Sequence, residues 1–473
     1  MATVIPIHSP LPAPAEPARA QLAEQPARLS GWRLAAFSSF AVPVAAAQMP
    51  VGVYLPAIYA QHYGIPLATL GLLFLAERLW GAAADPVIGI LSDRTRSRFG
   101  RRRPWIAAGG LLFGLSAIAL FFPGDAVSAW QLGLTLFVFY LGWSMMQIPY
   151  LAWSGEISGQ YHERTRIATY GTVAGSSALL LVLILPTIAD QLRPGDGPLK
   201  LAAMGTVVLV TLAIALVLTL RAFPEGPAPA TAPRPVPFAE ALRVILRDRL
   251  LLRVMGSDFA VTFGQLVRST LFVFFVSSYM GLQHWASGLF LLQFVFGIAA
   301  GPIWMKVALK FGKHRTAVLG EGLQVAINLG LLLVTPSAFP LLIALTVAQG
   351  LAQGSGNLML RAIVADVADQ HRLDTGVDRT ALFFSVFSLT TKAGMAAAVG
   401  VALPLVAWLG FNPQGHNTPE ALTGLLLVFA LGPAIAHAVS AWLIHGFPID
   451  EARHAEIRRA LHARDAAPSS PAE

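Results

Sequence analysis

The sequence of 473 residues is 55% hydrophobic, and only 12% of its residues are charged. Soluble domains carry about 25% charged residues, so this composition excludes an ordinary soluble protein and favours a chain that crosses a membrane. The net charge of +8 would suggest nucleic-acid binding in a soluble protein, and the absence of cysteine excludes disulfides and thiolate chemistry. We expect no nucleic-acid partner, because the basic residues lie in short segments between long apolar stretches.

The first 30 residues are rich in Pro, Ala and Glu and hold no apolar run. A secretory signal peptide needs an apolar run of about 7–15 residues after a basic start, so none is predicted. This composition predicts a disordered cytoplasmic arm over residues 1–30.

Twelve apolar stretches follow, each near the roughly 20 residues that a helix needs to cross the hydrocarbon core. They form two sets of six on either side of a proline-rich segment, which cannot be a membrane helix. The sequence therefore predicts an all-α membrane protein with twelve transmembrane helices, near residues 34–60, 69–91, 105–122, 130–150, 167–189, 201–220, 254–280, 285–308, 316–334, 339–362, 381–409 and 421–444.

The segments between and beyond these stretches define five regions. Residues 238–253 alternate apolar residues with arginines, which predicts an amphipathic helix at the membrane surface. The regions are an N-terminal arm at 1–30, a six-helix bundle at 31–222, a cytoplasmic linker with the amphipathic helix at 223–250, a second six-helix bundle at 251–446 and a cytoplasmic tail at 447–473.

Basic residues occupy every second loop. The loop after the second stretch holds six arginines within residues 94–103, whereas the intervening loops hold almost none. Short cytoplasmic loops are enriched in Lys and Arg, so this alternation predicts an even number of helices with both termini in the cytoplasm. We expect a multi-pass protein of the cell inner (plasma) membrane.

The two sets of stretches also resemble each other. The sequence FGRRR at 99–103 follows the second stretch, and FGKHR at 311–315 follows the eighth. The sequence ERT at 163–165 opens the fifth stretch, and DRT at 378–380 opens the eleventh. Two matches in register predict two halves related by a parallel repeat, the major facilitator architecture, which binds substrate near the midplane between the halves.

Charged residues inside the apolar stretches need an explanation, because each costs roughly 2.5–3.5 kcal/mol at the bilayer centre. Arg78 and Asp85 lie seven residues apart and share one helix face. Pro86 frees a backbone carbonyl beside Asp85, which suits a cation or proton site, unless Asp85 only pairs with a basic partner. Lys392 has no acid on its own helix, so its partner is substrate or an acid such as Asp85, or it loses its proton. We predict Asp85 and Lys392 as the coupling site.

Further polar and aromatic residues are candidates for the substrate site. Arg268 in the seventh helix lines the cavity or pairs structurally. Gln147 lies beside a proline kink and either faces the cavity or is packed, whereas Trp143 stacks on a sugar ring or anchors its helix at the interface. Together with Arg78 and Lys392, these three residues form the predicted substrate-binding set.

Charged residues at the predicted cytoplasmic helix ends are candidates for conformational gating on that side. The arginine-rich loop is expected to meet anionic lipid headgroups and acidic helix ends. The predicted gating residues are Asp93, Arg101, Glu163, Arg164, Asp366 and Arg379.

A family resemblance adds to this interpretation. The sequence ERLWGAAADPVIG at 77–89, with SDRTRSRFGRRRPW at 92–105, resembles the signature of the glycoside–pentoside–hexuronide:cation symporters, whose type member is the melibiose permease. The sequences IPY at 148–150 and ERT at 163–165, and the segment from Asp366 to Lys392, are similar to the same family, and the likeness spans residues 34–446. It implies a twelve-helix symporter with Asp85 near the coupling cation and Lys392 near both cation and substrate.

The chain departs from that family at several polar positions. Sodium-coupled members carry an Asp and an Asn where this chain has Gly81 and Ala84, and the family carries an acid where this chain has Gln147. The family's sugar-binding acid of the first helix falls near Ala45, and its arginine of the fifth helix near Thr172. Because several oxygen ligands are missing, we expect coupling to H⁺ rather than Na⁺, with no metal and no other cofactor.

The sequence therefore predicts a secondary active symporter that takes up a sugar or glycoside-like solute by alternating access. A lysophospholipid or other amphiphile is the alternative solute, since relatives in the resembled family move lysophospholipids. A non-transporting membrane sensor or receptor is the alternative from another class. No enzyme is expected, because phosphate-binding, metalloprotease and serine-hydrolase motifs are missing. The expected partners are the small-molecule solute and membrane lipid, and the chain is expected to act as a monomer.

Overall fold

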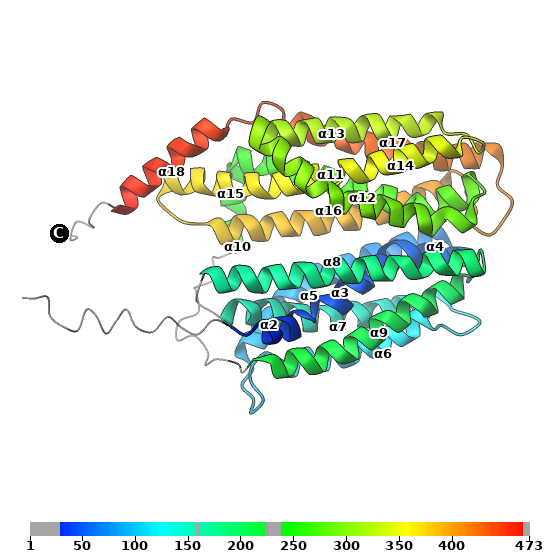
Figure 1. The fold of residues 1–473 in the computed structure, drawn as a ribbon, viewed down its shortest axis with the longest axis horizontal. Helices are drawn as coiled ribbons and strands as arrows, with labels where there is room; N and C mark the ends of the chain where they lie inside the picture. The colour runs from blue at the N-terminus through cyan, green and yellow to red at the C-terminus, as the bar shows by residue number, and fades with distance from the viewer. Residues whose placement is uncertain (1–28, 158–160, 224, 226–237, 467–473) are drawn as a thin grey trace, which may run out of the picture.

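The computed structural model describes residues 29–157, 161–223, 225 and 238–466, and it places them in two helical bundles that lie side by side (Figure 1). The predicted N-terminal arm, apart from its last two residues, lies outside the described residues. So do most of the predicted linker and the end of the predicted tail.

The first bundle is formed by the N-terminal half of the chain. Its first span is interrupted where Pro43 and Pro50 remove backbone donors, so the segment consists of four short helical pieces. The bundle contains α2 (Gly31–Ser38), α3 (Ala41–Met49), η1 (Pro50–Tyr54), α4 (Leu55–Gln61), α5 (Leu67–Arg94), α6 (Arg103–Phe121), α7 (Ala129–Glu156), α8 (Tyr161–Leu192) and α9 (Gly197–Ala222).

The second bundle is formed by the C-terminal half, after the short helix α10 (Phe238–Arg247). It contains α11 (Arg249–Phe274), η2 (Phe275–Tyr279), η3 (Gln283–Trp285), α12 (Ala286–Phe311), α13 (Lys313–Gly330), η4 (Leu331–Leu333), α14 (Phe339–Ala352), α15 (Ser355–Thr375), α16 (Thr380–Trp408) and α17 (Pro419–Ile444), and it is followed by α18 (Glu451–Ala466).

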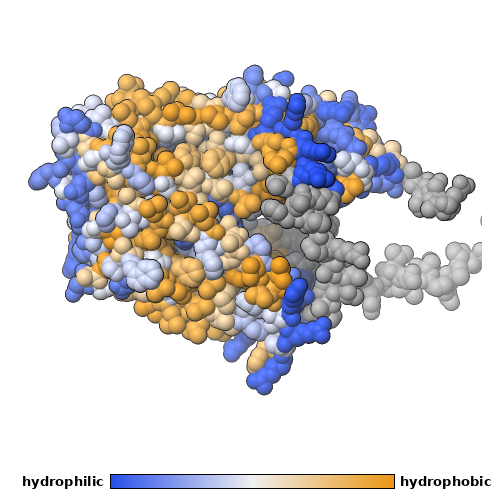
Figure 2. Space-filling model, turned by 180° about the vertical axis from the view of Figure 1, so that it is seen from behind, coloured by the Kyte–Doolittle hydropathy of each residue, from blue (hydrophilic) through white to orange (hydrophobic). Residues whose placement is uncertain are grey.

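The described helices have the length and surface of membrane spans. Eleven helical segments among the described residues are long and apolar enough to cross a bilayer. The twelfth span is the pair α14 and α15, which is divided at Gly354, whose φ of +85° favours glycine. Large apolar side chains face outward, including Leu309 at 78% and Trp442 at 75% exposure. Figure 2 shows an apolar belt between two polar ends, and the predicted all-α fold of twelve spans is confirmed.

Two other predicted segments differ from the observed structure. Residues 238–253 form two helices rather than one, because the Asp248 carboxylate accepts from the backbone N–H groups of Leu250 and Leu251 and thereby caps a new helix, α11. The predicted tail contains the helix α18, which contacts α15 through an ion pair of 3.0 Å between Arg372 and Asp465.

Within the first bundle, α6 and α7 approach each other backbone to backbone. A Cβ placed on Gly142 of α7 would lie 2.5 Å from the backbone nitrogen of Phe113, and one on Gly109 of α6 would lie 2.8 Å from that of Met146. Only glycine permits such contact at these two positions, and the two helices are therefore in close backbone contact where residues 109–113 meet residues 142–146.

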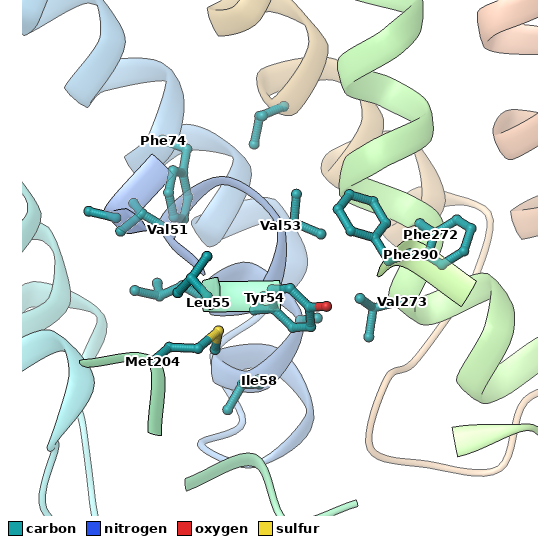
Figure 3. Close-up of a cluster of buried hydrophobic side chains, with 14 of the residues drawn as sticks. Val51, Val53, Tyr54, Leu55, Ile58, Phe74, Met204, Phe272, Val273 and Phe290 are labelled. Atoms are coloured by element: carbon teal, nitrogen blue, oxygen red, sulfur yellow. The ribbon is translucent and has the colours of Figure 1, made fainter. Parts of the chain in front are cut away.

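The two ends of the molecule differ. We call the end with residues 95–102, α10 and α18 the basic end, and the other the opposite end (Figure 1). At the opposite end, the bundles share one apolar cluster, in which Tyr54 of η1 contacts Phe290 of α12 with ring centroids 6.2 Å apart (Figure 3). The amide of Gln61 also donates to the Ser277 hydroxyl at 3.0 Å across the bundles. These contacts close the opposite end.

Candidate functional site

A cavity of about 420 Å³ lies between the two bundles. Its walls are α3, α5 and α7 of the first bundle and α15 and α16 of the second. On its opposite-end side, α5 and α16 are in contact, since a Cβ on Gly71 would lie 2.6 Å from Cδ of Pro404. The predicted residues Arg78, Asp85, Trp143, Gln147 and Lys392 all line this cavity.

Asp85 and Lys392 connect the two bundles across the cavity. Asp85 comes from α5 and Lys392 from α16, and the Lys392 ammonium donates to Oδ2 of Asp85. Both side chains remain partly exposed. An ion pair between two bundles is a contact that relative motion of the bundles makes or breaks, so these residues are placed to link charge with conformation.

A second pair of charges belongs to α5 alone. The Arg78 guanidinium lies 3.5 Å from the buried Glu77 carboxylate, donates to the Met395 sulfur of α16 at 3.6 Å, and lies 5.7 Å from the ring centroid of Tyr140. Glu77 lines the cavity together with Arg78 and Asp85. The sequence did not indicate this place for Glu77, because its helix is apolar on most sides.

The α7 wall presents aromatic and amide groups. The Trp143 indole N–H donates to Oε1 of Gln147 at 2.6 Å, one turn away, and the Trp143 ring is stacked against Tyr140 with centroids 6.0 Å apart. The amide of Gln147 is thereby oriented by the indole. This wall combines a flat apolar face with hydrogen-bonding groups, a combination that suits a polyhydroxylated ring.

Arg268 does not lie among the residues that line the cavity. It is 2% exposed inside the second bundle, donates to Oδ1 of Asn328 at 2.8 Å, and lies 5.3 Å from the ring centroid of Phe429. Arg361 of α15 lines the cavity instead and was not singled out from the sequence. It lies inside the predicted tenth stretch, 339–362, where its charge was the available signal.

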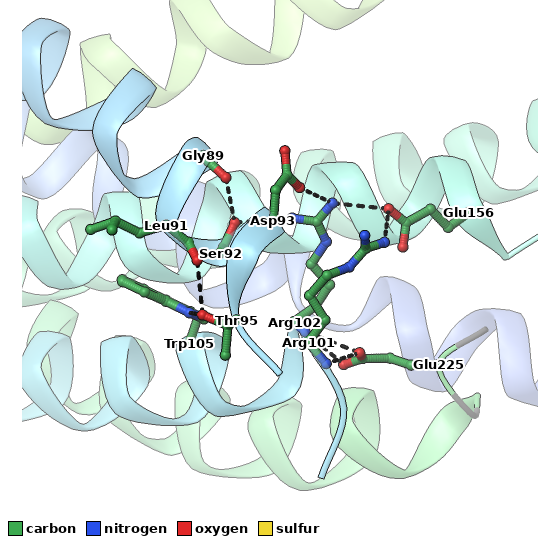
Figure 4. A network of polar contacts seen from close by, with 10 residues as sticks. All are labelled: Gly89, Leu91, Ser92, Asp93, Thr95, Arg101, Arg102, Trp105, Glu156 and Glu225. Atoms are coloured by element: carbon green, nitrogen blue, oxygen red, sulfur yellow. Dashed lines mark hydrogen bonds and ion pairs between the residues drawn. The ribbon is translucent and has the colours of Figure 1, made fainter. Parts of the chain in front are cut away.

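The predicted gating residues are divided between the bundles at the basic end. In the first bundle, Asp93 pairs with Arg102 at 2.5 Å, and Arg101 pairs with Glu156 at 2.8 Å (Figure 4). Glu163 pairs with Arg166 at 2.7 Å. The side chain of Arg164 lies outside the described part of the chain.

In the second bundle, Asp366 accepts from Lys313 at 2.6 Å and lies 3.3 Å from Nε2 of His454 in α18. Arg379 occupies the N-cap position of α16. The ion pairs named here each stay within one bundle, whereas the Gln61–Ser277 contact at the opposite end crosses between bundles. These described contacts join the bundles at the opposite end, where the cavity is closed.

A carboxylate from the segment after α9 contributes to the first bundle's basic end. Glu225 accepts from the backbone N–H groups of Arg101 and Arg102 (Figure 4) and from that of Arg103, at the start of α6. The free N–H groups and dipole of a helix N-terminus favour a carboxylate there. The arginine-rich loop is thus held by Glu225 as well as by Asp93 and Glu156.

The sequence profile of the family described as MFS/sugar transport protein matches residues 36–451. The chain belongs to this family. An uncharacterized symporter of Synechocystis sp. is 26% identical over 85% of this chain and 91% of that protein. The isoprimeverose transporter of Lactiplantibacillus pentosus is 23% identical over 85% of both. The human sodium-dependent lysophosphatidylcholine symporter 1 is 23% identical over 86% of this chain and 81% of that protein.

Solved structures show the same fold. The nucleoside transporter NupG superimposes with a TM-score of 0.59 at 12% identity, covering 89% of this chain and 98% of that chain. Together with the matches to symporters, this identifies the chain as a symporter of the major facilitator superfamily, and the resemblance to the cation symporters of glycosides is confirmed. In this MFS/sugar transport protein, Gly81 and Ala84 contribute no side-chain oxygen to the part of α5 beside Asp85.

Proposed function

We propose that this symporter takes up a sugar-like solute together with a proton, and that Asp85 carries the proton. The observation that supports this most is the ion pair between Asp85 and Lys392 across the central cavity. A carboxylate holds either a proton or a cationic partner, so protonation of Asp85 releases Lys392. When the proton leaves, the pair forms again, and the empty carrier returns with its charges matched.

The proposal places the basic end in the cytoplasm and the protein in the cell inner membrane. The arginine-rich loop at 94–103 supports this orientation, because short cytoplasmic loops are enriched in basic residues. With this orientation, the described conformation is the one that releases solute and proton to the cytoplasm. One chain supplies both walls of the cavity, which supports a monomer, and we propose no enzymatic step.

The choice of H⁺ over Na⁺ follows from the ligands around Asp85. A sodium ion needs several oxygen ligands, whereas Gly81 and Ala84 offer no side-chain oxygen and Lys392 already occupies the carboxylate. A proton needs one titratable acid. The resident cation Lys392 also repels a metal ion at this position but not a neutral, protonated carboxyl group.

The charges of the cavity favour a solute with an anionic group. Its described lining holds three cations and two acids. Arg78 lies beside Glu77 and Lys392 pairs with Asp85, which leaves the exposed Arg361 without an ion-pair partner among the described residues. A guanidinium binds carboxylate and phosphate groups through two parallel hydrogen bonds. We propose that Arg361 binds such a group while the Trp143 face contacts the rest of the solute.

Proteoliposomes test the proton step. An imposed inward proton gradient is expected to drive solute accumulation by the wild type but not by Asp85→Asn, which cannot release a proton. Asp125→Asn, an exposed carboxylate in the loop between α6 and α7, is the matched control and should behave as the wild type. Equal accumulation by Asp85→Asn and the wild type would refute the proposed role of Asp85, and accumulation driven by Na⁺ alone would refute proton coupling.

A matched pair of solutes tests the charge preference. Methyl glucuronide carries a carboxylate where methyl glucoside carries a hydroxymethyl group. Lysophosphatidylcholine represents the amphiphiles, because a 23% identical relative is named as its symporter. We expect the glucuronide to be transported in preference, and Arg361→Gln to raise its KM about tenfold while leaving the glucoside unaffected. Preference for the glucoside would refute the role of Arg361, and transport of the lysolipid alone would refute the sugar class.

A further inference from the structure

At the opposite end, one buried carboxylate is held by groups from both bundles. Asp190, near the end of α8, is 0% exposed. Its Oδ2 accepts from the backbone N–H of Ser287 in α12 at 3.2 Å, and its Oδ1 forms an ion pair with Lys200 of α9. Lys200 and Asp190 belong to the first bundle and Ser287 to the second, so the carboxylate joins the two.

The contact supplies α12 with a cap that its own sequence lacks. Trp285 occupies the N-cap position of α12 and makes no side-chain cap. Three other helices that begin at the opposite end, α7, α9 and α17, are capped by their own Ser128, Asp196 and Thr418. The first N–H groups of a helix need acceptors, and the helix dipole favours a negative one. Asp190 therefore caps α12 from the other bundle.

Lys200 allows this carboxylate to be buried. A buried charge is costly unless it is paired and hydrogen-bonded, and Lys200 provides the opposite charge within the first bundle. Lys200 also lines a polar cavity of about 240 Å³ between the bundles, together with Gln61 and Ser277. This polar cavity adjoins the apolar cluster of Figure 3, since Tyr54 and Ile58 belong to both.

We propose that Asp190 is a positioning residue of the transport cycle, which holds the opposite end closed by capping α12. The cap exists only while α8 and α12 are in contact. When this end opens, Asp190 keeps Lys200 and gains water, but α12 loses its acceptor. Removal of the carboxylate therefore shifts the balance towards the state that is open at the opposite end. The inference rests on the symporter fold and requires neither a particular solute nor a particular ion.

The chain contains no cysteine, which makes the contact measurable without background. A Cβ on Gly288 of α12 would lie 3.7 Å from Cγ2 of Thr187 in α8. A cysteine Sγ that takes the place of Thr187 Cγ2 would therefore adjoin the side chain of a cysteine at 288, and we expect the pair to form a disulfide when the end is closed. The rate of disulfide formation by Thr187→Cys/Gly288→Cys in proteoliposomes then reports how often the opposite end is closed.

The main variant, Asp190→Leu/Lys200→Met, removes both charges together and leaves neither one buried alone. We expect its cysteine pair to cross-link about tenfold more slowly than in the wild-type background, the size of effect of a charged hydrogen bond. Asp190→Asn keeps an amide acceptor without the charge and should be intermediate. Arg193→Gln alters an exposed ion pair at the same end, with Asp196, and should leave the rate unchanged.

A wild-type cross-linking rate in Asp190→Leu/Lys200→Met would overturn the proposal. If that variant does not fold, Asp190→Asn provides the test. A wild-type rate of cross-linking in Asp190→Asn would also contradict the proposal. The measurement uses neither solute nor proton gradient, so failure of the proposed transport function would leave its outcome intact.

Discussion

Lys392 of α16 and Asp85 of α5 are 307 positions apart in the chain, and their side chains form an ion pair that crosses the central cavity. The pair joins the two halves of the sequence repeat at the level where solute is expected to bind. Each half alone would leave one charge without a partner in an apolar bundle. The first prediction therefore concerns the two charges as a unit.

Neutralising Lys392 alone should be more harmful than neutralising both partners. In Lys392→Gln, the Asp85 carboxylate loses its partner, and we expect the free energy of unfolding to fall by about 1–3 kcal/mol. Asp85→Asn/Lys392→Gln should recover most of that loss while remaining unable to accumulate solute. Thermal unfolding in detergent and transport in proteoliposomes measure the two effects, and strictly additive losses would show that the residues act independently.

An added methyl group at Gly71 should force the opposite end apart. In Gly71→Ala, the new Cβ would meet Cδ of Pro404 at 2.6 Å and the carbonyl of Val399 at 3.2 Å, both in α16. We expect the Thr187→Cys/Gly288→Cys pair to cross-link several-fold more slowly in this background.

Gly81→Ala is the matched control on the same helix, because nothing lies within 4 Å of its Cβ position. It should cross-link like the wild type. Equal rates in Gly71→Ala and Gly81→Ala would mean that α5 and α16 can separate without opening the opposite end.

Loss of the Glu225 carboxylate should destabilise the arginine-rich loop. Glu225→Ala leaves three backbone N–H groups at the start of α6 without their acceptor, and caps of this kind contribute about 1–2 kcal/mol. The thermal midpoint of the protein in detergent is expected to fall. Glu456→Ala removes an exposed ion pair with Arg453 and should have little effect; a similar fall in both variants would argue against a capping role.

The stability contributed by Asp378 should depend on pH. The backbone N–H of Thr380 donates to Asp378 at 3.0 Å and holds the pKa of this carboxyl below its usual value of 3.8. A lowered pKa in the folded state means that the contribution is complete above pH 3.8 and is lost as the pH falls through the lowered value. Asp378→Ala should therefore unfold at a lower temperature than the wild type at pH 7, and the difference should shrink below pH 3.8. A constant difference would exclude this linkage.

Much of the fold could be predicted from the sequence, because membrane crossing is encoded in local composition. Long apolar stretches and alternating basic loops require no tertiary information, and they led to twelve spans. The breaks were harder to predict. The division at Gly354 depends on a backbone conformation, and the division at Asp248 depends on one capping side chain in a segment that otherwise has the pattern of one helix.

The site was predicted in part. Asp85 and Lys392 were identifiable because charges in apolar stretches are few. The face that each helix turns to the cavity was not, because most spanning helices here lack the polar stripe that orients a helix in water. The sequence therefore did not show that Arg268 lies inside the second bundle, or that Arg361 lines the cavity. Asp190 was missed because its contact with Ser287 joins two bundles, and spacing along the sequence does not reveal such a contact.

The contacting glycines of α6 and α7 limit how the transporter can change shape. Helices that touch along their backbones cannot slide or roll past each other without a clash at Gly109 or Gly142. We therefore expect α6 and α7 to move together as one unit when the two bundles change their relative position. Larger residues at these two positions would push α6 and α7 apart without entering the central cavity. We therefore expect their effect on transport to be the same for every solute.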